Sequence, residues 1–206
     1  MIVLDLYLTR HGQSYGNLPL NGGEATLVPL DQRPPGVETG RIKDDWCLTP
    51  LGQQQAVLLG ERLSAVPFDA IWCSPLERAH ATAKAIVEHQ PTPVALKIER
   101  ELLEIFDYGD ETPEEWHQRG LRVARALRGD SPPGARVLVV AHGAFNSFLL
   151  CALLGLPGPN FLFRFAHHNT GFSRILFHCK DTPEWDRVRL VHMNNLNHLP
   201  PELISS

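Results

Sequence analysis

The chain has 206 residues, of which 43% are hydrophobic and 20% are charged, and its formal net charge at pH 7 is −4. This composition is typical of one globular domain with a sizeable core. The sequence contains no run of Lys or Arg of the kind that binds nucleic acid or an anionic membrane. The longest apolar stretch, residues 145–156, is too short to cross a bilayer. We therefore expect a single cytoplasmic domain over residues 1–206, whereas the oligomeric state is not indicated.

Apolar runs and turn signals alternate along the chain. A buried strand is expected at residues 3–8, followed by an irregular segment at residues 17–47 that is rich in proline and glycine. Helices are then predicted at residues 50–63, 74–89, 112–128 and 144–154, and strands at residues 69–73, 94–98, 137–140, 172–177 and 185–192. Strands separated by helices predict a largely parallel sheet that is covered on both faces.

Three of these helices have recognisable start signals. Thr49 precedes Pro50, Ser74 precedes Pro75, and Thr112 precedes a proline and two acidic residues. A hydroxyl at the cap and proline in the first turn both favour a helix start.

The four cysteines are widely spaced, without the C-x-x-C pattern of redox or metal sites. We interpret Cys47, Cys73, Cys151 and Cys179 as reduced thiols. Cys73 lies at a predicted strand end, where a reactive thiol is conceivable, but burial without a chemical role is the favoured interpretation.

Two predicted strands run into a His-Gly pair, the first at His11-Gly12 and the second at His142-Gly143. Side chains at the carboxyl ends of strands in an open α/β sheet can converge on one site. Arg10 adds a permanent, planar positive charge that suits a phosphate group. This combination predicts phosphoryl chemistry on an imidazole.

Several segments in order resemble signatures of the histidine phosphatase superfamily, which has the phosphoglycerate mutase-like fold. They are residues 8–14 with Asn17, residues 48–52, residues 74–79, residues 102–104 and residues 139–143. The resemblance covers residues 1–155 and favours the phosphatase branch. It implies an α/β fold, a three-layer α/β/α sandwich with a mixed, mostly parallel central sheet.

The resemblance also implies a role for each site residue. His11 would be the nucleophile and form a phosphohistidine, Glu104 would be the proton donor, and Arg10, Arg78 and His142 would stabilise the transferred phosphoryl group. Neither a metal nor a cofactor is expected. The residues expected to bind the phosphate are Arg10, Gln13, Asn17, Arg78, His142 and Gly143.

Some assignments have alternatives. Asp107 lies close enough in sequence to Glu104 to be the proton donor instead. Helix N-termini after Gly12, Ser74 and Gly143 could supply further N–H donors to the phosphate. His167 and the following histidine do not have metal-ligand spacing and are expected at the surface or in hydrogen bonds. The alternating phenylalanines at residues 161–165 indicate core packing, with the wall of an apolar pocket as the alternative.

The predicted function is metal-independent hydrolysis of a small-molecule phosphate monoester. The alternatives are a phosphoglycerate mutase-type phosphotransferase and a non-catalytic phospholigand-binding protein. Residues 108–115 are acidic and short where the mutases have a basic insertion, and Ala144 replaces their usual asparagine, so water is the favoured acceptor. The segment at residues 18–47 is expected to be a lid or specificity loop, and its cations are Arg33, Arg41 and Lys43.

Overall fold

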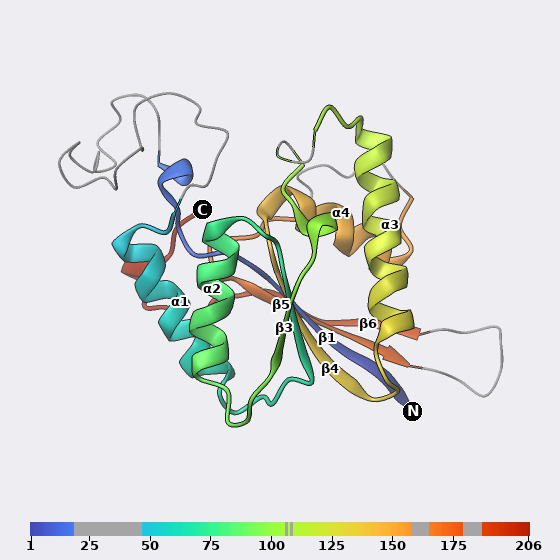
Figure 1. Ribbon diagram of the computed structural model, residues 1–206, viewed down its shortest axis with the longest axis horizontal. Coiled ribbons are helices and arrows are strands. Elements are labelled where there is room, and N and C mark those ends of the chain that lie inside the picture. The colour runs from blue at the N-terminus through green and yellow to red at the C-terminus, as the bar shows by residue number, and fades with distance from the viewer. Residues whose placement is uncertain (19–46, 106, 108, 158–164, 179–186) are drawn as a thin grey trace.

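The computed structural model describes residues 1–18, 47–105, 107, 109–157, 165–178 and 187–206 (Figure 1). The strands are β1 (Ile2–Arg10), β2 (Ala70–Cys73), β3 (Ala95–Ile98), β4 (Ala135–Ala141), β5 (Phe172–His178) and β6 (Arg187–Asn195). The helices are α1 (Pro50–Leu63), α2 (Glu77–Glu88), α3 (Pro113–Asp130) and α4 (Gly143–Leu154). Short 3₁₀ turns are η1 (Tyr15–Asn17), η3 (Arg100–Leu102) and η4 (Pro201–Leu203). Nearly all of the predicted loop at residues 18–47, and the phenylalanines at 161 and 163, lie outside the described residues.

The strands form one six-stranded sheet in the order β3-β2-β4-β1-β5-β6. The first four strands of this order are mutually parallel, whereas β5 runs antiparallel to both of its neighbours. The sheet is therefore mixed, as predicted. Its parallel part places the carboxyl ends of β1, β2 and β4 at one edge, where the predicted site residues follow.

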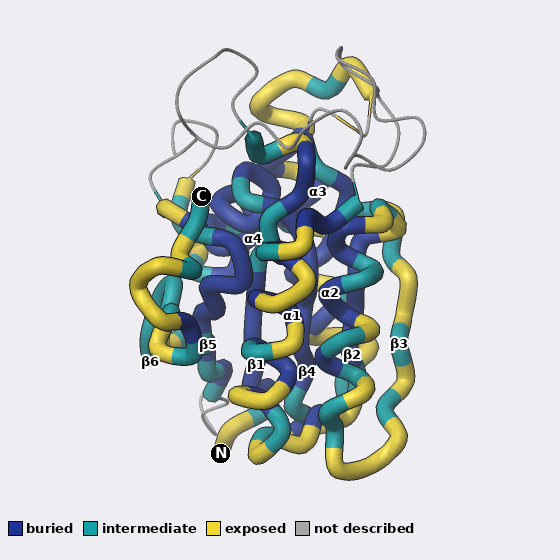
Figure 2. Tube along the Cα trace, turned by 90° about the vertical axis from the view of Figure 1, so that its left-hand side faces the viewer, coloured by how far each residue is buried: buried dark blue, intermediate teal, exposed yellow. Residues whose placement is uncertain are grey.

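Helices cover both faces of the sheet, with α1 and α2 on one face and α3 and α4 on the other (Figure 1). Alternate side chains of β1 serve the two cores: Leu6 and Leu8 pack with α3 and α4, and Tyr7 packs with α1 and α2. The central strands β1 and β4 are buried along most of their length, while β3 at the edge is more exposed (Figure 2). These layers confirm the predicted α/β/α sandwich.

Two of the three predicted helix starts are confirmed. The Thr49 hydroxyl accepts a hydrogen bond from the Gly52 amide at 3.0 Å. Thr112 and Glu115 form a capping box at the start of α3. The prediction for the second helix was wrong, because α2 begins only at Glu77. The hydroxyl of Ser74 is instead 2.8 Å from the ring of His142, so Ser74 contacts the residue that follows the neighbouring strand β4.

The strand boundaries also differ from the predicted ones. β1 extends to Arg10 because that residue still pairs with Ala141 of β4, and β6 extends to Asn195 because that residue pairs with Phe172. Pairing partners distant in sequence set these ends, and local composition does not reveal them.

The cysteines agree with the prediction where they are described. Cys47, Cys73 and Cys151 are thiols outside any disulfide, and Cys73 is fully buried. Burial raises the pKa of the Cys73 thiol to about 12, which keeps it protonated and unreactive. Cys179 lies outside the described residues.

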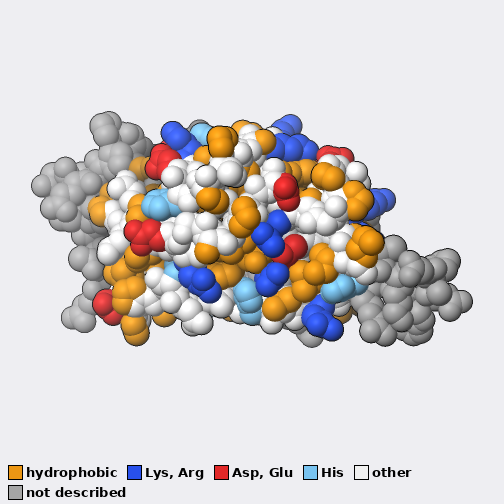
Figure 3. Space-filling model, turned by 90° about the horizontal axis from the view of Figure 1, so that it is seen from below, with side chains coloured by type: hydrophobic (Ala, Val, Ile, Leu, Met, Phe, Trp, Pro, Cys, Tyr) orange, Lys and Arg blue, Asp and Glu red, His pale blue; other side chains and the backbone are white. Residues whose placement is uncertain are grey.

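On the face shown in Figure 3, cationic and anionic side chains are interspersed with apolar ones. No helix in the described part of the chain combines the length and the apolar composition needed to cross a membrane.

Candidate active site

The sheet register brings the two histidines together. Arg10 at the end of β1 pairs with Ala141 at the end of β4, so His11 and His142 leave the sheet side by side. Their ring centroids are 5.1 Å apart, and both residues are buried. The predicted convergence at the carboxyl ends of the strands is therefore observed.

Two glycines allow this close approach of backbone segments. A Cβ atom on Gly12 would lie 2.4 Å from the carbonyl oxygen of Gly52, so the turn after His11 packs directly on the start of α1. A Cβ atom on Gly143 would lie 3.3 Å from Nε of Arg10. The glycine after each histidine therefore has a steric reason, namely contact with α1 in one case and with a guanidinium in the other.

The hydrogen bonds of His11 determine its tautomer. Nδ1 lies 2.7 Å from the carbonyl oxygen of Gly12, which can only accept, so Nδ1 carries the proton. Nε2 lies 3.2 Å from Nε of Arg78, which can only donate, so Nε2 carries the lone pair. Burial, followed by the positive charges of Arg78 and Arg10, lowers the pKa of His11 well below its usual value. The imidazole is therefore neutral at pH 7, and its Nε2 is unprotonated, as a nucleophile requires.

His142 is fully buried beside His11. Its Nε2 is bonded to the hydroxyl of Ser74 at 2.8 Å, while its Nδ1 is buried without a hydrogen-bond partner among the described residues. Burial and then the charge of Arg78 lower the pKa of His142 well below its usual value. A buried polar atom without a partner is costly, and a bound phosphoryl oxygen would satisfy it.

Arg10 has a similar unsatisfied group. One of its terminal nitrogens, Nη1, donates to the backbone carbonyl of His167 at 2.7 Å. Its Nε is buried and has no partner among the residues that the structure describes. Burial lowers the pKa of Arg10, but a guanidinium remains charged at neutral pH. The Arg10 side chain is therefore held through Nη1, while Nε remains available as a donor.

Arg78 connects the nucleophile to an acidic residue. Besides its contact with His11, its Nη2 forms an ion pair with Oδ2 of Asp107 at 3.0 Å. Both predicted cations, Arg10 and Arg78, thus lie beside the two histidines.

Glu104 follows the turn η3, and its side chain contacts the first turn of α4. Its carboxylate accepts hydrogen bonds from the amides of Ile105 and Phe145, both at 2.9 Å, and from the amide of Ala144 at 3.3 Å. The prediction that the first amides after Gly143 would be free for phosphate was therefore wrong for Ala144 and Phe145. These three amide donors fix the position of the Glu104 carboxyl group beside the first turn of α4.

The other two helix N-termini do not lie where they were predicted. The short turn η1 follows Gly12 in place of a helix, and the Gly12 amide donates to the hydroxyl of Thr82 at 3.0 Å. Ser74 precedes α2 by three residues, as described above. The Gly12 amide and the Ser74 hydroxyl form hydrogen bonds with residues that are distant in sequence.

Gln13 and Asn17 lie in the segment between His11 and the undescribed loop. The side-chain oxygen of Gln13 accepts from the Thr49 hydroxyl at 2.8 Å. The side-chain oxygen of Asn17 accepts from the backbone and the hydroxyl of Ser14. These bonds hold the segment in place, and the predicted phosphate contacts of Gln13 and Asn17 stay predictions.

The sequence prediction missed one residue that positions the site. Asn169 is fully buried, and its amide donates to the backbone carbonyl of His11 at 3.0 Å and to Asn17 at 3.3 Å. Its own oxygen accepts from the hydroxyl of Ser205. No spacing in the sequence indicates the contacts with His11 and Asn17, because each joins segments that are more than 150 residues apart.

The buried neutral histidines predict a loss of stability in acid. His167 is only 6% exposed, and burial, followed by the charges of Arg10 and His168, lowers its pKa to about 4. In the unfolded chain a histidine binds its proton near pH 6.5, so stability from this group is complete above about 6.5 and is lost as the pH falls to about 4. We expect urea unfolding to show a loss of up to about 3 kcal/mol from His167.

The variant His167→Gln isolates this contribution, since carboxylates titrate equally in both proteins. The difference in unfolding free energy between wild type and variant should change between pH 7.5 and pH 4.5. A constant difference across that range would contradict the assignment.

Residues 6–110 and 106–191 match the family model of the histidine phosphatase superfamily, branch 1. The chain belongs to this superfamily. The uncharacterized phosphatase PhoE of Bacillus subtilis is 32% identical over 169 residues, which cover 72% of this chain and 76% of that protein. A 2,3-bisphosphoglycerate-dependent phosphoglycerate mutase of Bartonella bacilliformis is 28% identical over 186 residues, covering 73% and 82% of the two chains. Relatives of both enzyme classes thus resemble this chain.

Solved structures confirm the fold. The crystal structure of phosphoserine phosphatase from Entamoeba histolytica, in complex with 3-phosphoglyceric acid, aligns with a TM-score of 0.69 and 22% sequence identity. The alignment covers 96% of this chain and 100% of that structure. At this identity the likeness establishes the phosphoglycerate mutase-like fold and does not identify the substrate.

Proposed function

We propose that this histidine phosphatase hydrolyses a small-molecule phosphate monoester through a phosphohistidine on His11, without a metal ion. The observation that carries the proposal is the state of His11. Its imidazole is neutral, and the electron pair of Nε2 faces the guanidinium of Arg78. The unsatisfied donors of Arg10 and His142 near this atom supply the remaining contacts for a phosphoryl group. Superfamily membership supports an enzyme that acts on phosphate.

In the first step, Nε2 of His11 forms a bond to phosphorus while the bond between phosphorus and the ester oxygen breaks. The leaving oxygen takes a proton from the acid, which we assign to Glu104. Arg10, Arg78 and His142 stabilise the charge on the three equatorial oxygens. In the second step, water attacks phosphorus, Glu104 takes its proton, and His11 is released with inorganic phosphate.

Transfer to a second substrate, as in the mutases, is the alternative outcome of the same first step. The acidic segment after Glu104 favours water as the acceptor, because it has no cation to hold a substrate carboxylate in its described part. Glu111 in this segment is paired with Arg119 of α3 at 2.7 Å, so it belongs to the scaffold. A non-catalytic binding role has less support, since the chemically active set around His11 is complete.

Metal independence is tested with a panel of phosphate monoesters in the presence and absence of EDTA. Because side chains supply the nucleophile and the positive charge, we expect rates with phenyl phosphate to agree within about twofold in both conditions. Inorganic phosphate should be the product even when 2- or 3-phosphoglycerate is present as an acceptor. Loss of activity in EDTA with recovery on adding a divalent ion would contradict the proposal, and phosphoryl transfer would identify a mutase.

The same proposal includes the remaining expectations from the sequence. The chain acts as one catalytic domain in the cytoplasm, and its partner is the small phosphate ester, with no nucleic acid or membrane. Residues 18–47 serve as a specificity loop, almost all of it outside the described residues. Cell fractionation tests the location.

A further inference from the structure

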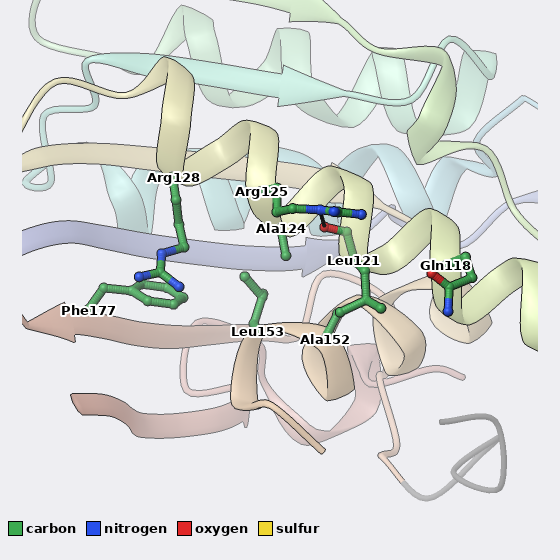
Figure 4. A pocket seen from close by; sticks show the side chains of 8 residues that line it. All are labelled: Gln118, Leu121, Ala124, Arg125, Arg128, Ala152, Leu153 and Phe177. Atoms are coloured by element: carbon green, nitrogen blue, oxygen red, sulfur yellow. Dashed lines mark hydrogen bonds between the residues drawn. The ribbon is translucent and has the colours of Figure 1, made fainter. Parts of the chain in front are cut away.

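Two pockets on the described surface differ in their relation to the active site. One, of about 320 Å³, lies between α3, α4 and β5, where Arg125 donates to the carbonyl of Leu121 (Figure 4). None of the described residues that line it belongs to the candidate site. The other pocket, of about 490 Å³, is lined by Arg10, Glu104 and Gly143 of that site. It is therefore continuous with the place where the ester bond would break.

The rest of this second pocket is formed by neutral side chains. Ala144 and Ser147 come from α4, residues 165–168 contribute Phe165, Ala166, His167 and His168, and Ser206 completes the lining. We call it the leaving-group pocket, because Glu104, the proposed donor to the leaving oxygen, lines it while the nucleophile His11 does not.

His167 is the unusual member of this lining. Its side chain is 6% exposed, and both ring nitrogens are buried without a hydrogen-bond partner among the described residues. Its ring is neutral at pH 7, so it offers one donor and one acceptor. A buried polar group without a partner costs about 1–3 kcal/mol, and a ligand hydroxyl that reaches one of the two ring nitrogens would recover this cost for that nitrogen, as donor or as acceptor.

The charges of the pocket limit the ligand further. Its charged side chains among the described residues are Arg10 and Glu104, and both are engaged at the phosphate end of the site. A second phosphate or a carboxylate on the substrate would enter a pocket whose remaining lining has no described cation to pair with it. Burying an unpaired charge is far more costly than burying a hydroxyl.

We propose that the leaving-group pocket receives a neutral, hydroxylated alcohol and that His167 hydrogen-bonds to one of its hydroxyl groups. The substrate class is then the phosphate monoesters of polyols and sugars, in contrast to phosphorylated acids. This inference rests on the proposed function. His167 acts as a specificity residue, and Ser147 and Phe165 complete the surface against which the alcohol lies.

Glycerol 3-phosphate and 3-phosphoglycerate test the inference, since they share a carbon skeleton and differ by a hydroxymethyl group in place of a carboxylate. We expect kcat/KM for glycerol 3-phosphate to be at least about tenfold higher. In His167→Ala, the ratio of kcat/KM for glycerol 3-phosphate to that for phenyl phosphate should fall about fivefold, the worth of one hydrogen bond. His167→Gln retains a donor and an acceptor and should preserve more of the ratio.

His178→Ala is the matched control. His178 also has a buried ring nitrogen without a partner among the described residues, but it pairs with Ile2 at the opposite end of the sheet. In His178→Ala, the preference for glycerol 3-phosphate over 3-phosphoglycerate and the ratio of glycerol 3-phosphate to phenyl phosphate should both remain as in the wild type. If His167→Ala fails to fold, His167→Gln and the wild-type preference carry the test.

The outcomes separate the two proposals. If the wild type does not hydrolyse phenyl phosphate, the proposed function fails and the inference fails with it. If phenyl phosphate is hydrolysed but 3-phosphoglycerate is the equal or better substrate, only the inference is overturned. It is also overturned if His167→Ala lowers the rates with glycerol 3-phosphate and phenyl phosphate by the same factor.

Discussion

Replacing His11 by alanine is expected to lower kcat by at least about 10⁴-fold with every phosphate ester, because removal of a nucleophile leaves no covalent route. The structure supports this expectation through the lone pair on Nε2 of His11, which faces the guanidinium of Arg78 at 3.2 Å. The assay compares wild type and His11→Ala with phenyl phosphate in the presence of EDTA. Thermal unfolding checks that the variant is folded.

A second measurement follows the intermediate itself. Wild-type enzyme quenched in base during turnover should carry one additional phosphoryl group, and that group should be lost in acid, as is typical of phosphohistidine. His11→Ala should carry none, and His178→Ala should behave as the wild type. Substantial activity or a remaining phosphoryl group in His11→Ala would place the nucleophile elsewhere.

Replacing Glu104 by glutamine is expected to slow glycerol 3-phosphate hydrolysis by roughly 10²-fold, while p-nitrophenyl phosphate is slowed by less than about tenfold. The reason is that nitrophenolate is a good leaving group without a proton, whereas the alkoxide of glycerol must be protonated as it leaves. The carboxylate of Glu104 is held by three amides at the border of the leaving-group pocket.

Asp107→Asn is the matched variant, since it also removes one negative charge at nearly constant shape. Asp107 is paired with Arg78, so we expect its loss to disturb the phosphate contacts and to slow both substrates by similar factors. A stronger dependence on the leaving group in Asp107→Asn than in Glu104→Gln would assign the acid role to Asp107. Equal losses with both substrates in Glu104→Gln would make that residue a positioning group.

The sequence alone determined the layers of the fold and the position of the two histidines at the strand ends. Runs of apolar residues with glycine or a capping hydroxyl at their ends are local signals, and they place His11 and His142 at the carboxyl ends of two strands. The topology of parallel strands then brings such ends to one edge. The capping residues Thr49 and Thr112 likewise act within a few residues of their own position, so their helices were predicted correctly.

Only the tertiary structure decided how the polar groups of the site are shared. Ser74 was expected to start a helix and instead bonds to His142, and the first amides of α4 bond to Glu104. Asn169 holds the backbone of His11 from the far end of the chain. Each of these polar groups had several possible hydrogen-bond partners. A buried polar group pairs with the partner that the packed chain places within hydrogen-bond distance. That partner is often distant in sequence, so no local pattern of residues predicts it.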